Sequence, residues 1–236
     1  MQVEVDFFNG MRKLLNYHNI ISISGKSGTG KTTLTLQLIG NLLTNEEPYS
    51  DSCIWIQASE ILPIKRLNQI FQEHPKELEY IQNNIYIIPQ KDVIHNYEQQ
   101  ASIIQNIIGP SVDIPPSLHY IVTDNISHHL RYKLAQYSSP KDISSLQDAF
   151  YETQLMPLIL FCKMNDIILI LIHEVTYSPK LDKLRPFFYK LYDRIKTIDL
   201  VLSNIYNDKK KNLQILFNNI KWKYQFQLKQ RGIVII

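Results

Sequence analysis

The sequence predicts one α/β domain: a mostly parallel sheet flanked by helices, extended by an antiparallel, β-rich C-terminal part. Through the first three-quarters of the chain, short apolar runs alternate with stretches of helical periodicity, which is typical of parallel α/β sheets. After residue 190 only strand-like runs remain, separated by polar turns. No internal repeat or low-complexity linker interrupts the 236 residues. We therefore expect a single domain with one continuous sheet.

The strands expected in the first part are apolar throughout, as are strands that are buried on both faces of a parallel sheet. They are expected at 19–24, 53–57, 84–89, 118–123 and 167–173. Between them, apolar residues recur at helical spacing. Helices are expected at 31–43, 61–72, 98–109 and 144–164.

The C-terminal part contains four further runs of strand character with no room for helices between them. They cover 197–204, 212–217, 221–228 and 232–236. We expect an antiparallel meander that extends one edge of the sheet. The domain thus divides into an N-terminal segment (1–18), an α/β core (19–190) and the meander (191–236).

Composition excludes several classes of protein. The two cysteines, Cys53 and Cys162, are far apart and match no metal-binding spacing, so we expect buried thiols in a reducing compartment. No apolar run reaches the roughly 20 residues of a membrane span. The N-terminus lacks the basic start and apolar core of a signal peptide. We expect a cytoplasmic protein with no membrane partner.

Charge is unevenly distributed along the chain. Residues 1–175 carry 12 Lys and Arg against 18 Asp and Glu, whereas residues 176–236 carry 13 against 4. A basic C-terminal quarter indicates either an anionic partner or a lysine-rich face exposed to solvent.

A glycine-rich loop follows the first expected strand. Three of the seven glycines lie within six residues, directly before a lysine and two threonines. The stretch matches the Walker A pattern of glycine, any four residues, then Gly-Lys-Ser/Thr, whose backbone N–H groups bind phosphates. The expected nucleotide-binding residues are Gly25, Lys26, Ser27, Gly28, Thr29, Gly30, Lys31, Thr32 and Thr33.

Three polar side chains complete the expected chemistry with ATP and Mg²⁺. The Lys31 ammonium reaches the β- and γ-phosphates, where it is also catalytic, and the Thr32 hydroxyl ligates Mg²⁺. Asp124 ends the run HYIVTD, and an acid at the carboxyl end of a buried strand points toward the phosphates. Asp124 is therefore the second expected magnesium residue; the alternative is a loop aspartate that caps the next segment.

Hydrolysis also needs a group that orients water. Glu60 follows the second expected strand and Glu174 follows the fifth, so both lie at the edge of the sheet where the phosphates bind. Both are candidate catalytic residues, and either could instead be a surface acid.

The order of these motifs resembles the RecA superfamily, and within it the archaeal RadB-like recombinase paralogues. GKSGTGKTTLTLQL is similar to their Walker A, and CIWIQASEILPIKRLNQI to their strand, acidic turn and arginine-bearing helix. HYIVTDNISHHLRYK resembles their Walker B strand, and QLMPLILFCKMNDIILILIHEV their long helix and strand. The resemblance implies a RecA-like P-loop ATPase core, acting in DNA recombination or repair.

The chain departs from the family in three places. The family's catalytic glutamate falls on Ser59, one residue before Glu60, and its preceding aspartate falls on Gln57. Because neighbouring side chains of a strand point to opposite faces, Glu60 faces the site only if the chain bulges. The family's Asn-Gln pair falls on His173 and Glu174. These departures suggest ATP binding with weak or slow hydrolysis.

The resemblance also implies DNA contacts in two loops, at about 131–145 and 176–190. Cations there would neutralise phosphates, while Tyr132, Tyr137, Tyr177 and Tyr189 could stack on unpaired bases. The expected DNA-binding residues are Arg131, Lys133, Lys141, Lys180, Lys183 and Arg185. Phe187 and Phe188 fit the core face of a helix better, and His128 and His129 a structural role.

The sequence is compatible with several kinds of binding partner. Phe7 and Phe8 either insert into a neighbouring subunit, as in family filaments, or pack on their own domain. The main hypothesis is an ATP-binding, RecA/RadB-like protein that binds single-stranded DNA, with a recombinase, paralogue or second copy as partner. The alternative is a nucleotide-gated, KaiC-like or paralogue-complex subunit without DNA activity. A small-molecule kinase fits poorly, because the helix-free tail does not resemble an arginine-rich lid.

Overall fold

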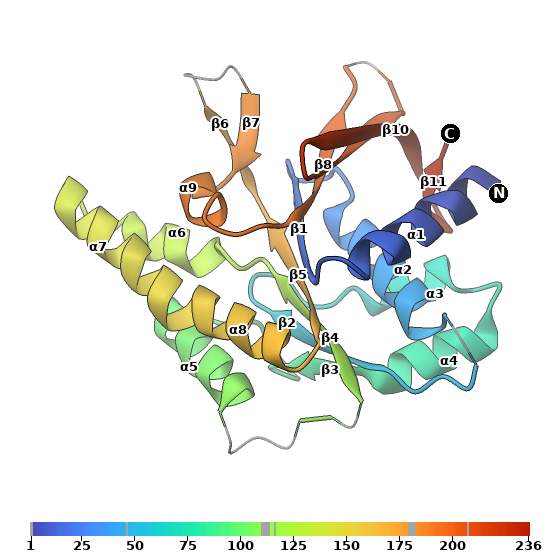
Figure 1. Ribbon diagram of the computed structural model, residues 1–236, viewed down its shortest axis with the longest axis horizontal. Helices are drawn as coiled ribbons and strands as arrows, with labels where there is room; N and C mark the ends of the chain where they lie inside the picture. The colour runs from blue at the N-terminus through green and yellow to red at the C-terminus, as the bar shows by residue number, and fades with distance from the viewer. Residues whose placement is uncertain (1, 46, 110–113, 116, 179–182, 207) are drawn as a thin grey trace.

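The computed structural model describes residues 2–45, 47–109, 114–115, 117–178, 183–206 and 208–236. In these residues nine strands form one sheet in the order β11-β10-β9-β8-β1-β5-β4-β2-β3, with helices on both faces (Figure 1). The strands are β1 (Ile20–Gly25), β2 (Ser52–Gln57), β3 (Ile85–Ile88), β4 (Leu118–Asp124), β5 (Ile168–His173), β8 (Ile198–Asn204), β9 (Lys211–Phe217), β10 (Ile220–Lys229) and β11 (Gly232–Ile235). A separate hairpin pairs β6 (Val175–Ser178) with β7 (Lys183–Pro186). The strands expected in the core are thus confirmed within two residues at each end.

Six strands, from β8 to β3 in the sheet order, pair in parallel, so their carboxyl ends meet at one edge. The remaining strands, β9 to β11, are antiparallel. The expected antiparallel meander at the edge of the sheet is confirmed, since β8 to β11 pair antiparallel in sequence order. Its first strand, β8, joins the core in parallel to β1, with Ile21 opposite Ile198. The chain reaches β8 through the β6–β7 hairpin and α9 (Tyr189–Tyr192), a crossover that the sequence pattern did not reveal.

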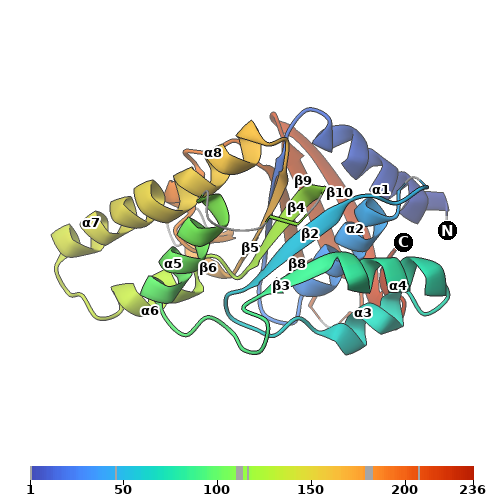
Figure 2. The ribbon, with the colours of Figure 1, turned by 90° about the horizontal axis from the view of Figure 1, so that it is seen from below.

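Two helical layers cover the sheet (Figure 2). One apolar core joins the sheet to α1–α4, and the other joins it to α5, α6 and α8. The first layer is α1 (Gln2–Leu15), α2 (Lys31–Leu43), α3 (Ile64–Ile70) and α4 (Pro75–Asn84). The second is α5 (Tyr97–Ile108), α6 (His128–Leu134), α7 (Pro140–Phe150) and α8 (Met156–Met164).

The expected helices at 31–43 and 98–109 are confirmed as α2 and α5. The long helix is confirmed too, as α7 and α8 joined by the π-helical turn Tyr151–Leu155. It begins earlier than expected, because Pro140 supplies a favourable first position. The helices α1, α4 and α6 were not predicted from the sequence pattern. No helix among the described residues is long and apolar enough to cross a membrane.

Phe7 and Phe8 pack inside their own domain. Their side chains are only 2% and 7% exposed, and the Phe7 ring lies 5.6 Å from that of Tyr224 on β10. This settles the two alternatives in favour of packing, because a ring buried in the core is not free to enter a neighbouring subunit.

The stretch FFYKLY forms a shorter helix than its spacing predicts. Only Tyr189–Tyr192 is helical, because Phe188 adopts a left-handed backbone with φ 57°. Leu191 and Tyr192 are buried, whereas Phe187 and Phe188 are half-buried. The expectation that both phenylalanines lie in a helical core face is thus wrong in part.

Candidate functional site

The loop between β1 and α2 depends on two glycines. Gly28 and Gly30 have φ values of 73° and 102°, a left-handed backbone that side chains with a Cβ rarely adopt. A Cβ on Gly30 would also lie 2.7 Å from Leu228 Cδ2 of β10. The glycine pattern therefore encodes both the curl of the loop and its close packing against the C-terminal strands.

The N-terminus of α2 is built to attract an anion. Its N-cap residue is Gly30, no side chain caps it, and no acidic residue lies in the first turn. The first N–H groups of a helix have no intrahelical partner and carry the positive end of the helix dipole. Such an end, preceded by a glycine loop, is suited to phosphate.

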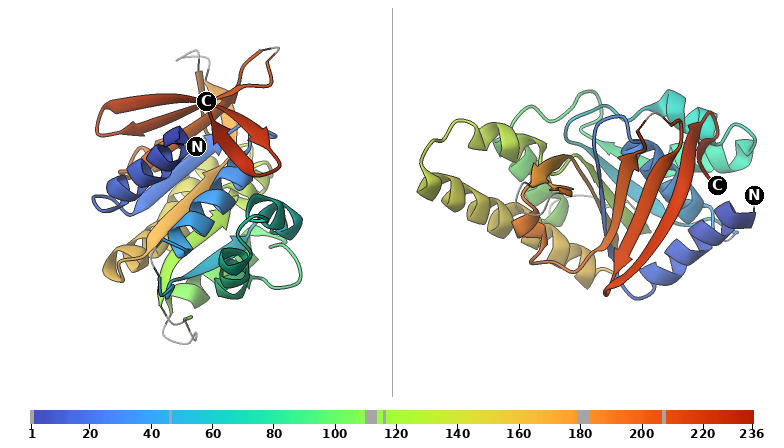
Figure 3. Two further views of the ribbon diagram at one scale, coloured as in Figure 1. Left: turned by 90° about the vertical axis from the view of Figure 1, so that its right-hand side faces the viewer. Right: turned by 90° about the horizontal axis from the view of Figure 1, so that it is seen from above.

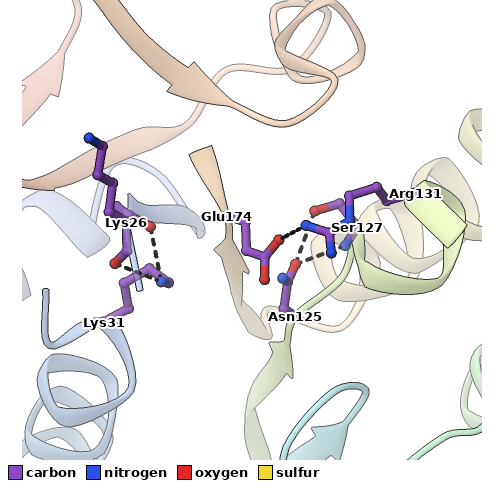
Figure 4. A network of polar contacts seen from close by, with 7 residues as sticks. Lys26, Lys31, Asn125, Ser127, Arg131 and Glu174 are labelled. Carbon is purple, nitrogen blue, oxygen red and sulfur yellow. Dashed lines mark hydrogen bonds and ion pairs between the residues drawn. The ribbon is translucent and has the colours of Figure 1, made fainter. Parts of the chain in front are cut away.

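Lys31 bends back over the loop (Figure 4). Its Nζ donates to the carbonyl oxygens of Gly25 and Lys26 at 2.9 and 3.3 Å. Burial lowers the pKa of Lys31, and the nearby carboxylates of Asp124, Glu174 and Glu60 oppose that shift. The three acids that the sequence singles out therefore all act electrostatically on one ammonium.

Thr32 and Asp124 are brought together across 92 residues of sequence. The Thr32 hydroxyl donates to Asp124 Oδ2 at 3.0 Å. Burial raises the pKa of Asp124 to about 6, a shift that the hydrogen bond from Thr32 opposes. The pair fits magnesium, since Mg²⁺ takes one or two protein oxygens and completes its shell with water and phosphates. No cluster of three metal-ligating side chains occurs among the described residues, so the chain offers no all-protein metal cage there.

Glu60 lies beside this pair, because β2 has ended before it. The chain turns after Gln57, and the N–H groups of Ala58 and Ser59 both donate to the carbonyl oxygen of Asp124, at 2.8 and 3.0 Å. The alternation of a strand therefore does not decide which way Glu60 points. Glu60 is exposed and interacts electrostatically with Lys31 and Asp124.

Gln57, which takes the place of the family's aspartate, holds this turn in position. Its side chain is 1% exposed. Its amide donates to the carbonyl oxygens of Pro89 and Asp92, at 2.8 and 3.1 Å, and its oxygen accepts from the N–H of Leu62. All of these contacts are to backbone, so Gln57 supports the site without contacting its reactive groups.

Glu174 is tied to Arg131 of α6 by an ion pair (Figure 4). The Arg131 guanidinium also lies over the rings of Tyr132 and Phe187, at 5.2 and 5.4 Å. The preceding residue, His173, is fully buried. Glu174 therefore acts electrostatically on Lys31 and is also joined to Arg131 of α6. Through Phe187, Arg131 in turn contacts the chain just after the β6–β7 hairpin.

Two cations at the site escaped the sequence analysis. Arg66 Nε donates to Thr33 Oγ1 at 3.3 Å, and its NH2 and NH1 groups donate to the carbonyl oxygens of Lys229 and Gln230. Lys211 Nζ donates to the carbonyl oxygen of Gly28 at 3.0 Å. The only signal for Lys211 was the basic charge of the C-terminal quarter; its contact with the loop spans 183 residues.

Of the six expected DNA-binding cations, the structure describes four side chains, and three of these carry acidic partners. Lys133 pairs with Glu98 at 2.7 Å and Arg185 with Asp193 at 3.6 Å, as Arg131 does with Glu174. Lys141 is exposed on the first turn of α7. Lys180 lies outside the described residues, and for Lys183 the structure describes the backbone only.

The two neighbouring histidines of α6 fit a structural role. A ring nitrogen of His129 lies 2.7 Å from the carbonyl oxygen of Ala58, in the turn that leads to Glu60. Burial lowers the pKa of both His128 and His129. The histidine at 129 thus fastens α6 to the turn beside Asp124.

Comparison with known proteins supports the class that this geometry defines. The family model of the NB-ARC domain, a P-loop NTPase family, matches residues 9–104, a stretch that includes the glycine loop and α2. No curated protein matches the sequence. The chain contains a P-loop NTPase core, and residues 25–33 are its expected nucleotide-binding loop.

Proposed function

We propose that the chain is a RecA-like ATPase in which ATP·Mg²⁺ at the P-loop controls a single-stranded DNA contact, in recombination or repair. One observation supports this most strongly: Asp124, Glu60 and Glu174 lie near enough to Lys31 to oppose the lowering of its pKa, and Glu174 forms an ion pair with Arg131. A change of charge at Lys31 is therefore felt by α6 and the β6–β7 hairpin, which carry the expected DNA contacts.

The chemistry follows from the placement of each group. The loop N–H groups and Lys31 would bind the phosphates, and Thr32 with Asp124 would hold Mg²⁺, which stabilises the charge that develops during phosphoryl transfer. Glu60 is exposed and, within the described residues, makes no hydrogen bond or ion pair. It is free to accept a proton from water, whereas Glu174 is held by Arg131. Glu60 is therefore the proposed base.

ATP turnover by single variants tests this assignment. We expect Lys31→Ala to abolish turnover, and Glu60→Gln to lower it by about 10²- to 10⁴-fold, the usual cost of losing a positioned base. Glu79→Gln, an exposed glutamate on α4, is the matched control and should turn over ATP at the wild-type rate. Equal rates for Glu60→Gln and Glu79→Gln would show that Glu60 is not the base.

Binding of a labelled, single-stranded oligonucleotide with and without ATP tests the DNA contact. Removing a phosphate contact with Lys141→Ala or Arg185→Ala should weaken binding and reduce the slope of log affinity against log salt by about 0.7 per contact. Lys76→Ala, on α4 away from these loops, should leave both unchanged. Wild-type protein that binds no strand at low salt in either nucleotide state would refute the DNA contact.

A second candidate is a nucleotide-gated subunit that binds a protein, either a recombinase, a paralogue or a second copy. The acidic partners of Arg131, Lys133 and Arg185 favour it, since paired cations attract phosphate less. ATP-dependent retention of a protein partner, without DNA binding, would select this candidate.

A further inference from the structure

A cavity of about 710 Å³ lies on the face of the sheet opposite α2. Ile21 and Ile23 of β1 point into the core beneath α2, so the alternate residues Ser22 and Ser24 point the other way, and both line the cavity. The β6–β7 hairpin and α9 lie to one side of strands β8–β10 (Figure 3, right). The volume falls in the range of small-molecule sites, about 300–1,000 Å³.

The floor of the cavity combines apolar side chains with polar and charged ones. Strand pairing places Ser22 beside Asp199, Asp199 beside Leu216, and Leu216 beside Lys221. All four line the cavity. Asp199 and Lys221 are thus two strand spacings apart, about 10 Å. The floor therefore offers an anionic and a cationic group at a fixed separation.

Asp199 keeps acceptor capacity toward the cavity. Its Oδ1 accepts from the Thr197 hydroxyl at 2.5 Å, and the Ser22 hydroxyl is a second donor to the carboxylate. A carboxylate offers about four acceptor positions, so two remain. Burial raises the pKa of Asp199, and an added pair of donors would offset that cost of burial.

The walls supply a flat aromatic surface and a cation. The Arg185 guanidinium lies 4.3 Å from the centre of the Tyr189 ring, and both residues line the cavity.

We infer that this cavity binds a guanine nucleotide, either free or as one base of a single strand. Guanine presents two adjacent donors, N1–H and the N2 amino group, which match the two remaining acceptor positions of Asp199. Its O6 acceptor can receive a hydrogen bond from Ser24, which lines the cavity. The flat base stacks on the Tyr189 ring, and Lys221 and Lys196, which also line the cavity, neutralise the phosphate. Only the strand form rests on the proposed DNA function.

Calorimetric titration of the full chain carrying Lys31→Ala tests the site apart from the P-loop. The probes are GMP, IMP, AMP, CMP and UMP, which lack the β- and γ-phosphates that a P-loop binds. GMP should bind with saturation, and IMP, which lacks the N2 amino group, about tenfold more weakly. UMP offers one donor between two acceptors and should bind least. The absence of saturable GMP binding, or equal affinity for GMP and UMP, would overturn the inference.

Two variants identify the residues responsible. In the same background, Asp199→Asn should weaken GMP binding about 10- to 100-fold, because it removes hydrogen bonds to a charged acceptor. Asp142→Asn, an exposed acid on α7, should not. With Lys31 intact, Asp199→Asn should retain wild-type ATP turnover, which shows that it folds. GMP affinity that is equal in Asp199→Asn and Asp142→Asn would refute the assignment of Asp199.

Oligonucleotide binding distinguishes a free guanine nucleotide from a guanine base within a single strand. An oligothymidine with one central guanine should bind wild-type protein more tightly than plain oligothymidine, and GMP should remove the difference. GMP binding without a guanine preference in strands supports the free nucleotide as ligand. Failure of ATP to bind at the P-loop would refute the proposed ATPase but leave the GMP titration unaffected.

Discussion

His173 is a buried imidazole whose two ring nitrogens have no hydrogen-bond partner among the described residues. Burial, with a smaller effect from Lys31, lowers the pKa of His173 to about 3. The unfolded chain binds a proton below pH 6.5 and the folded chain does not, so His173 makes the free energy of unfolding decrease as pH falls below 6.5. Between pH 7 and 5 we expect a loss of about 2 kcal/mol from this residue.

His173→Phe isolates this effect, because phenylalanine keeps an aromatic ring against Tyr192, whose ring centre lies 4.2 Å from that of His173, and cannot bind a proton. Urea unfolding at pH 7 and pH 5 should show a smaller loss of stability in the variant by about 2 kcal/mol. His74→Phe, an exposed histidine after α3, should keep the wild-type pH dependence. Parallel curves for wild type and His173→Phe would contradict the predicted burial of a neutral ring.

Asp124 changes the free energy of unfolding with pH in the opposite direction to His173. Its folded pKa of about 6 lies above the ordinary 3.8, so ionisation destabilises the folded chain as pH rises from about 4 to 6. Asp124→Asn should therefore raise the free energy of unfolding at pH 7 without Mg²⁺ by up to about 3 kcal/mol. The same change should remove Mg²⁺-dependent nucleotide binding. A variant that is less stable than wild type would show that Asp124 is paired better than its burial indicates.

At the scale of elements, the C-terminal strand is attached to the P-loop helix by one buried side chain. Gln37 of α2 donates to the carbonyl oxygen of Ile233 and accepts from its N–H, at 3.2 and 2.8 Å. Gln37→Leu keeps a similar volume but removes the partners of the N–H and carbonyl groups of Ile233. This should lower the free energy of unfolding by about 2–4 kcal/mol. Urea unfolding measures this cost.

Amide hydrogen exchange measures whether this loss of stability is confined to β11. Among the described residues, β11 is an edge strand that pairs with β10 alone. Gln72→Leu, an exposed glutamine after α3, serves as the control and should change neither measurement. If Gln37→Leu unfolds at the wild-type urea concentration, the attachment of β11 depends on apolar packing alone.

Local patterns in the sequence were sufficient to predict the elements that form the expected phosphate site. The glycines, Lys31 and Asp124 are recognisable because each follows an apolar strand at a fixed offset. Glu60 was ambiguous, since its direction depends on hydrogen bonds from Ala58 and Ser59 to Asp124, far along the chain. The parallel pairing of β8 and the contact of Lys211 with the loop depend on the crossover through α9, which no local pattern specifies.

At the scale of the whole molecule, the basic C-terminal part is folded onto the nucleotide loop. Lys211 of β9 binds the carbonyl oxygen of Gly28, and Leu228 of β10 packs against Gly30. Arg66 joins the turn between β10 and β11 to Thr33. Part of the excess positive charge of the C-terminal quarter thus lies beside the glycine loop of the same chain. A nucleotide bound at this loop would therefore lie next to elements from both ends of the sequence.

This arrangement predicts that ATP·Mg²⁺ stabilises the entire domain rather than the loop alone. A ligand present at 100 times its dissociation constant adds about 2.7 kcal/mol to the free energy of unfolding, which corresponds to about 5–10 °C for a chain of this size. We expect this shift in a thermal melt of wild-type protein and of Lys76→Ala, and none in Lys31→Ala. A shift that persists in Lys31→Ala would mean that the nucleotide binds away from the P-loop.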